Sequence, residues 1–247
     1  MQDIRIPEAR AARHGGADFY NSGLKWTETL VLWGQLKATD SVLDVGCGPG
    51  RMAIGIGQTL GSGVHYLGLD VIETDVVVAR EAITSQFPSF RFAHLDAFNG
   101  LYNPKGTMAP DKVTFPVSDA STDFVFAASL FTHMFDLEVG RYLGEMARVL
   151  RPGGRLLTSW FILSAQSQAQ TATGKARFGF PHRRDDGTFV ELPDRPEEVV
   201  AFTDARVRQL FNQAGFDVTA FHQGSWPRLA LGAKPRHSQD VYVCVKR

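Results

Sequence analysis

The sequence predicts an α/β protein built on a doubly wound, Rossmann-like sheet, and three observations lead to that fold class. Short apolar runs alternate with helical patterns from about residue 40 onward. A glycine-rich turn joins the first apolar run to the first helix, and aspartates close the next two runs. Strands that alternate with helices at this spacing favour a parallel sheet covered by helices on both faces.

The first half of this alternation contains four predicted strands. Each strand is a short apolar run with residues that favour extended backbone. The strands are predicted at 41–45, 65–70, 90–96 and 123–127, with helices at 51–60 and 74–86 between the first three.

A third helix is predicted from Asp136, which can serve as its N-cap. Its apolar residues recur at offsets typical of one helical face; they are Val139, Leu143, Met146, Ala147 and Leu150. The run RPGG at 151–154 ends this helix, and a fifth strand is predicted at 155–163. A helix over 203–214 stops at Gly215, a residue suited to the left-handed stop position. Two last strands are predicted near 216–223 and 239–246.

Length and composition indicate one soluble domain over 1–247. Lys plus Arg equals Asp plus Glu, 26 against 26, so no net charge favours a nucleic-acid or membrane partner. The polar start of the chain and the absence of a long apolar run predict a cytoplasmic protein. Only Cys47 and Cys244 are present, so neither a disulfide framework nor a thiolate metal site is expected.

Three segments fall outside the alternation of strands and helices. Residues 1–37 are interpreted as an N-terminal cap, and 98–121 form a long connection. Residues 164–200 interrupt the core, which is assigned to 38–163 and 201–247, and long insertions of this kind are commonly functional lids. The insertion is therefore predicted to act as a lid that selects the substrate, with Arg183 and Arg184 as candidates for binding an acidic group.

The glycine-rich turn contains Gly46, Gly48 and Gly50 between a strand and a helix. Glycines there allow a tight turn and the close approach of a ligand to the backbone. A dinucleotide-binding turn has the spacing G-x-G-x-x-G, whereas this one reads G-x-G-x-G. The spacing argues against a nicotinamide oxidoreductase, and the turn alone could be a plain strand-to-helix connection.

Two aspartates at successive strand ends indicate a nucleoside ligand. Asp70 ends the second strand, where a carboxylate can accept hydrogen bonds from both ribose hydroxyls. Asp96 ends the third strand, where a carboxylate can accept from an adenine amine. Together with the glycine turn, these positions predict a nucleoside pocket at one edge of the sheet.

At these positions the sequence resembles the class I S-adenosylmethionine-dependent methyltransferases, from about residue 38 to its end. The matching segments are VLDVGCGPGR at 42–51, LGLD at 67–70, HLDAF at 94–98, DFVFAASLFTHM at 123–134 and MARVLRPGGRLL at 146–157. The resemblance implies a seven-stranded sheet in the order 3-2-1-4-5-7-6, with the seventh strand antiparallel. The cofactor that it implies is S-adenosyl-L-methionine.

The resemblance also implies a role for individual residues in binding the cofactor. Gly46, Cys47 and Gly48 would border the methionine part with their backbone, and Asp44 would help to hold its ammonium group through water or backbone. Asp70 would bind the ribose and Asp96 the adenine, with a backbone contact from Ala97. Ser129 would lie beside the sulfonium end. The stretch 15–26 resembles a cap in which Phe19, Tyr20 or Trp26 closes over the cofactor.

His133 follows the fourth strand, at the edge where open α/β sheets bind their ligands. An imidazole titrates near neutral pH and can remove a proton from a hydroxyl acceptor. An alternative is that His133 only caps or orients the helix that starts near Asp136. The Asn/Asp-Pro-Pro-aromatic run of nucleobase N-methyltransferases is replaced here by Leu130-Phe-Thr-His133, which argues against that activity.

The predicted activity is therefore methyl transfer to a small-molecule acceptor, at a hydroxyl oxygen and without a metal. No pair of histidines has the spacing of a metal site. Two alternatives remain open: an RNA or protein methyltransferase, and a non-catalytic S-adenosylmethionine-binding protein. The balanced charge and the absence of a basic module argue against the RNA methyltransferase. The acceptor and the oligomeric state are left undetermined.

Overall fold

The protein is built on a seven-stranded sheet, seen here in a computed structural model that describes residues 4–13, 18–230 and 232–247. The strand order is β10-β11-β5-β4-β1-β2-β3, and β11 runs antiparallel to both of its neighbours. This is the order 3-2-1-4-5-7-6, so the predicted fold class is confirmed. The strands are β1 (Ser41–Val45), β2 (His65–Asp70), β3 (Phe90–His94), β4 (Thr122–Ala127), β5 (Leu150–Trp160), β10 (Phe216–His222) and β11 (Asp240–Lys246).

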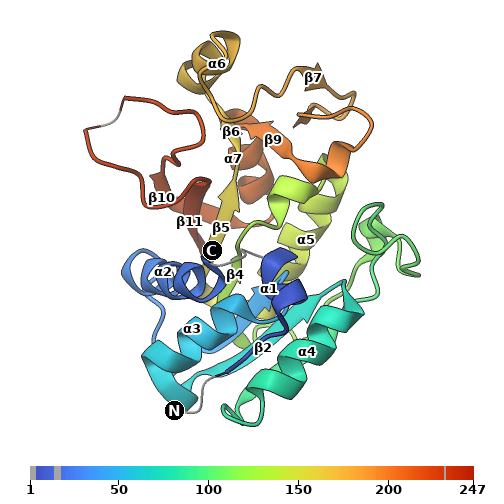
Figure 1. The fold of residues 1–247 in the computed structure, drawn as a ribbon, viewed down its shortest axis with the longest axis vertical. Helices are drawn as coiled ribbons and strands as arrows, with labels where there is room; N and C mark the ends of the chain where they lie inside the picture. The colour runs from blue at the N-terminus through green and yellow to red at the C-terminus, as the bar shows by residue number, and fades with distance from the viewer. Residues whose placement is uncertain (1–3, 14–17, 231) are drawn as a thin grey trace.

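Helices cover both faces of this sheet (Figure 1). One face packs against α2 (Phe19–Leu32), α3 (Arg51–Leu60) and α4 (Glu73–Ile83), and the other against α5 (Asp136–Val149) and α7 (Asp204–Gln213). Short elements complete this part: α1 (Glu8–Arg13), η2 (Gly61–Gly63), η3 (Pro110–Lys112) and η4 (Phe131–His133). Among the described residues, no helix is both long enough and apolar enough to cross a membrane.

Alternating residues of each strand supply the two hydrophobic cores. Successive strand side chains point to opposite faces, so a strand covered on both sides is apolar at every position. Phe124 and Phe126 of β4 lie in the core beneath α2, α3 and α4, whereas Val125 and Ala127 lie in the core beneath α5 and α7. This double burial explains the continuous apolar runs that predict the strands.

A second, four-stranded sheet in the order β6-β9-β8-β7 is formed by residues in and beside the predicted lid. In Figure 1 this sheet and α6 lie at one end of the molecule, and α1 to α4 lie at the other. Phe161, Phe180 and Trp226 form a separate hydrophobic cluster there. The elements are β6 (Ile162–Leu163), α6 (Ala165–Ala172), β7 (His182–Arg183), β8 (Phe189–Val190), η5 (Pro196–Glu198) and β9 (Val200–Thr203).

A buried carboxylate joins the second sheet to the main one. Asp240, at the start of β11, is fully buried and accepts hydrogen bonds from the backbone N–H of Ile162 at 2.8 Å and of Gly224 at 2.7 Å. The indole N–H of Trp226 donates to it at 2.7 Å, and the Gln223 amide donates as well. Four donors on one buried carboxylate fix β6 and the segment after β10 to the same point.

Some boundaries differ from the sequence prediction. The fifth strand, predicted at 155–163, ends at Trp160, and Ile162–Leu163 belong to the second sheet. Asp136 is the first residue of α5 and not its N-cap, and its carboxylate pairs with Arg206 at 2.6 Å. The N-cap position belongs to Phe135, whose N–H donates to Glu138 at 3.0 Å. β5 begins at Leu150, which pairs with Thr122 before the register shifts at the turn 151–154. Pairing across a bulge has no signal in apolar periodicity.

The N-terminal cap packs against the core through a close contact between α2 and α3. A Cβ atom at Gly55 would lie 2.5 Å from Thr27 Oγ1 and 2.7 Å from the carbonyl oxygen of Gly23. A Cβ atom at Gly23 would lie 2.3 Å from the carbonyl oxygen of Arg51. The two glycines therefore allow the helix backbones to touch, which places α2 beside the first residue of α3.

We expect Gly55→Ala to destabilise the protein, although alanine is the better helix former. Alanine gains about 1 kcal/mol over glycine in a helix interior. Forcing a methyl group against backbone costs about 1–3 kcal/mol, since backbone cannot move aside as a side chain can. The expected net loss is up to about 2 kcal/mol in the free energy of unfolding, measured by urea denaturation.

Gly144→Ala is the matched control, because Gly144 lies inside α5 with no atom within 4 Å of the position of its Cβ. It should gain about 0.5–1 kcal/mol from helix propensity alone. Equal gains for both variants would show that α2 does not contact α3 in this way.

Candidate functional site

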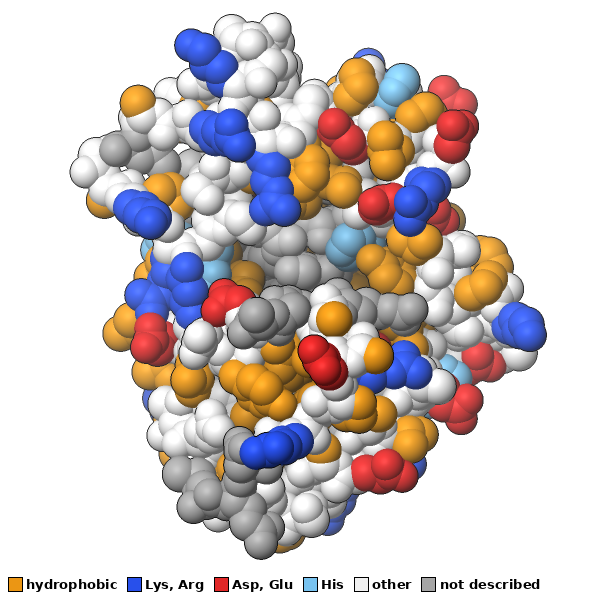
Figure 2. Space-filling model, viewed as in Figure 1, with side chains coloured by type: hydrophobic (Ala, Val, Ile, Leu, Met, Phe, Trp, Pro, Cys, Tyr) orange, Lys and Arg blue, Asp and Glu red, His pale blue; other side chains and the backbone are white. Residues whose placement is uncertain are grey.

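A cavity of about 420 Å³ opens at the carboxyl ends of β1, β2 and β4. Figure 2 shows the molecule hollowed between the end that carries α6 and the end that carries α1 to α4. Small-molecule sites have volumes of about 300–1,000 Å³. Of the residues predicted for the site, those that line the cavity are Gly46, Cys47, Gly48, Asp70, Ser129 and His133.

The glycine turn forms one wall of the cavity, and two of its N–H groups are bonded to the backbone of β2. The N–H groups of Gly46 and Cys47 both donate to the carbonyl oxygen of Leu69, at 2.8 and 3.0 Å. Gly46 has φ +86°, and a Cβ atom there would lie 3.2 Å from the Leu130 side chain. Glycine is needed at this position because the left-handed backbone and the close neighbour both disfavour a side chain.

Asp70 holds the turn in place from the end of β2. Its Oδ2 accepts the N–H of Gly48 at 2.7 Å, and its Oδ1 accepts the N–H of Ile72 at 2.8 Å. Asp70 lines the cavity and is 9% exposed. A carboxylate oxygen can accept more than one hydrogen bond, so both oxygens can also bind ribose hydroxyls.

Asp44 lies beneath the turn and does not line the cavity. It is fully buried, and the Tyr66 hydroxyl donates to its Oδ2 at 2.6 Å. Its Oδ1 has no hydrogen-bond partner among the described residues. Burial raises the pKa of Asp44 to about 7. A buried carboxylate oxygen without a donor fits a role in holding a cationic group above it, as the resemblance implies.

The two residues predicted to contact adenine do not line the cavity. The carboxylate of Asp96 accepts from Thr107 at 2.6 Å and from Asn103 at 3.3 Å, both in the long connection. Ala97 is buried, and its N–H donates to the carbonyl oxygen of Leu95. At this edge the cavity is lined by Leu95, Phe98, Asn99, Tyr102 and Pro110. Adenine binding by Asp96 stays a prediction.

His133 lies in η4 and lines the cavity, with contacts to the lid. Its Nδ1 is 3.0 Å from the carbonyl oxygen of Glu197 and 3.3 Å from the Tyr102 hydroxyl. A carbonyl oxygen can only accept a hydrogen bond, so Nδ1 must carry the proton. The other ring nitrogen, Nε2, is then unprotonated and can act as an acceptor.

The surroundings of His133 favour its neutral form. Burial lowers the pKa of His133 below its ordinary value, an effect that the backbone of Glu197 and Glu198 and the Glu198 carboxylate partly offset. The imidazole is therefore neutral near pH 7 and can accept a proton at Nε2. The helix-capping position is occupied by Phe135, so His133 does not cap α5, and its role as a base stays a prediction.

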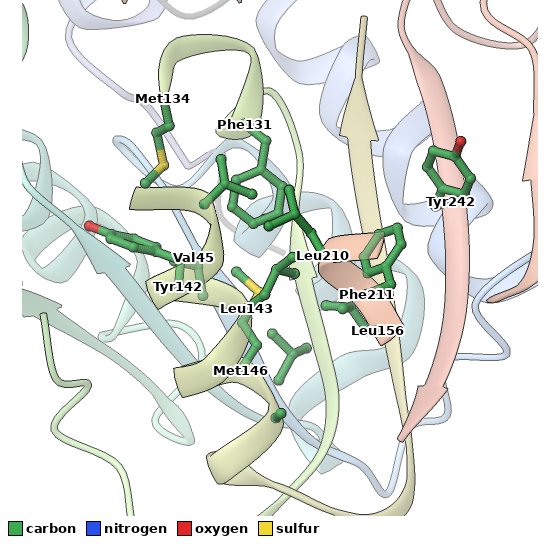
Figure 3. Packing of buried hydrophobic residues seen from close by; sticks show 14 of the residues in the cluster. Val45, Phe131, Met134, Tyr142, Leu143, Met146, Leu156, Leu210, Phe211 and Tyr242 are labelled. Carbon is green, nitrogen blue, oxygen red and sulfur yellow. The ribbon is translucent and has the colours of Figure 1, made fainter. Parts of the chain in front are cut away.

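Sequence patterns did not identify several polar residues of the cavity. Glu138 and Tyr142 belong to α5, and Gln239 is the residue directly before β11. Figure 3 shows the Tyr142 ring with its hydroxyl directed away from Leu143 and Met146, which pack in the core. Tyr142 is 5% exposed, and its hydroxyl makes no hydrogen bond within the described residues. The helical pattern could have indicated that Glu138 and Tyr142 lie close together, because they are one turn apart in α5 and next to the buried Val139.

The aromatic residues proposed to close over the cofactor lie outside the cavity lining. Phe19 is buried in the core, and Trp26 stacks on His237 with ring centroids 3.9 Å apart. The Tyr20 hydroxyl accepts the N–H of Ile6 at 3.0 Å. Residues 15–17 of the predicted cap stretch, like His14, lie outside the described residues. In the cap, Ser22 accepts a hydrogen bond at 3.1 Å from Arg51, which lines the cavity.

The lid arginines also lie outside the cavity lining. Arg183 is exposed, and the Arg184 guanidinium lies over the Phe135 ring at 3.9 Å and beside Asp186. Among the described residues, no group of three or more His, Cys, Asp or Glu side chains is arranged to hold a metal ion. Metal independence stays a prediction.

The fold and the cavity together define the class of this protein. The site of a nucleoside is formed by a glycine turn, a carboxylate at the end of β2 and a cavity where the chain order switches from β1 to β4. The strand order of the sheet is that of the class I methyltransferases. These features are those of the class I S-adenosylmethionine-dependent methyltransferases. Residues 42–154 match the family model described as a methyltransferase domain.

Two curated relatives extend this match. Methyltransferase GfsG of Streptomyces halstedii is 33% identical over 135 residues, 55% of this chain and 42% of the relative. O-methyltransferase resE of Aspergillus sclerotiorum is 31% identical over 176 residues, 68% of this chain and 59% of the relative. The chain thus spans about half the length of the curated relatives it matches.

A solved structure supports the fold over nearly the whole chain. The crystal structure of a SAM dependent methyltransferase from Aquifex aeolicus superposes with a TM-score of 0.61 and 18% identity. The match covers 98% of this chain and 100% of the other. At this identity the likeness shows the fold alone.

Proposed function

We propose that the protein transfers a methyl group from S-adenosylmethionine to a hydroxyl oxygen of a small-molecule acceptor, without a metal. The single observation that carries the oxygen target is His133, whose Nδ1–H is held by the Glu197 carbonyl while Nε2 is left as an acceptor. When bound, the cofactor supplies a methyl group activated by its positive sulfonium sulfur. The similarity to resE, which is named as an O-methyltransferase, supports the same target.

The chain's own groups then have distinct tasks. Asp70 and the glycine turn would hold the nucleoside, and Asp44 would help to hold the ammonium group through water or backbone. Nε2 of His133 would take the proton of the acceptor hydroxyl, which makes the oxygen a better nucleophile. The Glu197 carbonyl would stabilise the imidazolium that forms, as the partner of a catalytic histidine does in other enzymes. The segment with Glu197 packs against η4, and there it would help to exclude water from His133.

The cavity itself supports a small acceptor. Its volume of about 420 Å³ falls within the range of small-molecule sites. The lining near His133 combines apolar and aromatic side chains with few polar groups; these include Tyr102, Leu130, Met134, Glu138 and Tyr142. The carboxylate of Glu138 disfavours an anionic acceptor and favours one that presents hydrogen-bond donors such as hydroxyl groups.

Two measurements test the proposal. Calorimetry should show binding of S-adenosylhomocysteine and none of NAD; binding of NAD alone would overturn the proposed class of activity. The protein is then incubated with S-adenosylmethionine and a panel of phenols, sugars and amines, and products are detected by the mass of one added methylene group. We expect methylation of hydroxyl compounds that persists after thorough chelation. Methylation of amines alone, or loss of activity on chelation, would contradict the oxygen target or the metal independence, respectively.

A further inference from the structure

Ser129, at the exit of β4, has an unusual backbone held by three elements of the main sheet. Its φ is +61°, a left-handed value that is uncommon for serine. The Ser129 N–H donates to Ser159 Oγ of β5 at 2.7 Å. The hydroxyls of Ser129 and Ser159 both donate to Oε1 of Gln239, at 3.0 and 2.7 Å. Strained backbone that is held this firmly commonly marks a functional position.

These bonds fix the orientation of the Gln239 amide. The Ser159 oxygen already accepts the Ser129 N–H, and its own proton needs an acceptor, which Oε1 provides. With the amide reversed, that proton would have no acceptor within the described residues. Oε1 therefore faces the two serines, and the Nε2 group of Gln239, which makes no hydrogen bond to a described residue, is available to the cavity that Gln239 lines.

The segment that carries Gln239 is anchored on the cap. His237, two residues earlier, is 9% exposed, and its Nε2 lies 2.6 Å from Thr29 Oγ1 of α2. Its ring stacks on Trp26, and Arg236 donates to Thr29 at 2.9 Å. The cap thus holds the segment that carries Gln239, and the two serines hold its amide. Little conformational entropy is therefore lost when the amide binds a ligand.

The cavity has two chemically different ends. Asp70 and the aromatic residues of the long connection lie at the β2 and β3 end. At the β1 and β4 end, the lining contains Gln239 and Arg51, which is the first residue of α3. Arg51 is directed toward the cap, where it donates to Ser22. An amide N–H donor and a cation at one end of a cavity complement a carboxylate.

We infer that Nε2 of Gln239, together with Arg51, binds the carboxylate of the methionine part of S-adenosylmethionine. The inference rests on the proposed function. It assigns a cofactor contact to a residue well outside the matched segment 42–154. It also gives residues 232–239, which lead into β11, a task in cofactor binding.

The test compares two ligands that differ by the amino-acid part. S-adenosylhomocysteine carries the carboxylate, whereas 5′-methylthioadenosine keeps the adenine and ribose but lacks it. Gln239→Glu keeps an oxygen acceptor for both serines and replaces the N–H donors with negative charge. We expect it to weaken S-adenosylhomocysteine binding by about 10- to 100-fold in calorimetry, and 5′-methylthioadenosine binding by no more than about 2-fold.

Two further variants keep the test decisive. Gln239→Met removes the donors without adding charge and should weaken S-adenosylhomocysteine alone, by about 3- to 10-fold. Gln168→Glu makes the same chemical change on the exposed surface of α6 and should leave both affinities unchanged. Melting curves check that each variant is folded.

The outcomes separate this inference from the function on which it rests. Equal weakening of both ligands by Gln239→Glu, or no weakening of S-adenosylhomocysteine by either Gln239 variant, would overturn the inference and leave the methyltransferase assignment intact. A wild-type protein that binds neither ligand would overturn the proposed function and, with it, this inference.

Discussion

Replacing His133 with asparagine is expected to lower kcat by about 10²- to 10⁴-fold, the usual contribution of a general base. The Nδ2 group of asparagine lies close to the position of the histidine Nδ1 and can still donate to the Glu197 carbonyl. The variant therefore keeps the contact with the lid and loses only the Nε2 acceptor. The affinity for S-adenosylhomocysteine and the melting temperature should change little, because neither depends on Nε2.

The pH profile of the wild-type enzyme provides an independent check. The base must be neutral, so kcat/KM should fall as the pH drops through the pKa of His133 in the free enzyme. Burial lowers that pKa below the ordinary histidine value of about 6.5, so the inflection should lie on the acid side of 6.5 and the rate should be level near pH 7. This acid limb should be absent from the residual activity of His133→Asn.

His65→Asn serves as the control, since His65 is exposed at the start of β2 and does not line the cavity. It should keep wild-type kcat. A His133→Asn variant with near-wild-type turnover across neutral pH would rule out the base and leave His133 with an orienting role only.

Replacing Asp70 with alanine is expected to weaken the binding of S-adenosylhomocysteine by about 100-fold or more. Two hydrogen bonds from ribose hydroxyls to a carboxylate contribute about 1.5–3 kcal/mol each. The variant also removes the acceptor of the Gly48 and Ile72 N–H groups, which shapes the glycine turn. Calorimetry measures the affinity, and urea denaturation measures the accompanying loss of stability.

The choice of ligand distinguishes Asp70 from Gln239. Both S-adenosylhomocysteine and 5′-methylthioadenosine contain the ribose, so Asp70→Ala should weaken them equally. Asp185→Ala, which removes an exposed carboxylate from the lid, should affect neither. A selective loss of S-adenosylhomocysteine in Asp70→Ala would contradict the ribose assignment and move this carboxylate to the amino-acid end of the cofactor.

Much of the fold could be predicted because strands buried on both faces and one-sided helices leave strong patterns in the chain. The apolar run at β4 and the periodic face of α5 are such patterns. The second sheet was not predicted, since its strands β6, β7 and β8 are two residues long and cannot show periodicity. Its attachment depends on Asp240, whose buried donors come from two segments far apart in the chain, β6 and the residues after β10.

The residues of the site likewise fall into those that the sequence could identify and those that it could not. Gly46, Gly48 and Asp70 could be found because a ligand that lies across strand ends requires fixed residue types at fixed distances from each strand. For Asp96 the distance from the strand is as expected, but Thr107 and Asn103 of the long connection bind its carboxylate. Sequence spacing places a residue at a strand end and does not determine which partner its side chain finds.

The sequence by itself determined the doubly wound sheet, the glycine turn, Asp70 and the position of His133, because each depends on local periodicity or on spacing along one strand and its exit. Only the tertiary structure decided that Glu197 holds the imidazole through its backbone carbonyl and that Gln239 is bound to Ser129. Every residue has a carbonyl group, so its use leaves no mark in the sequence. Gln239 meets Ser129 only because β11 inserts beside β5, a contact between residues far apart in the chain.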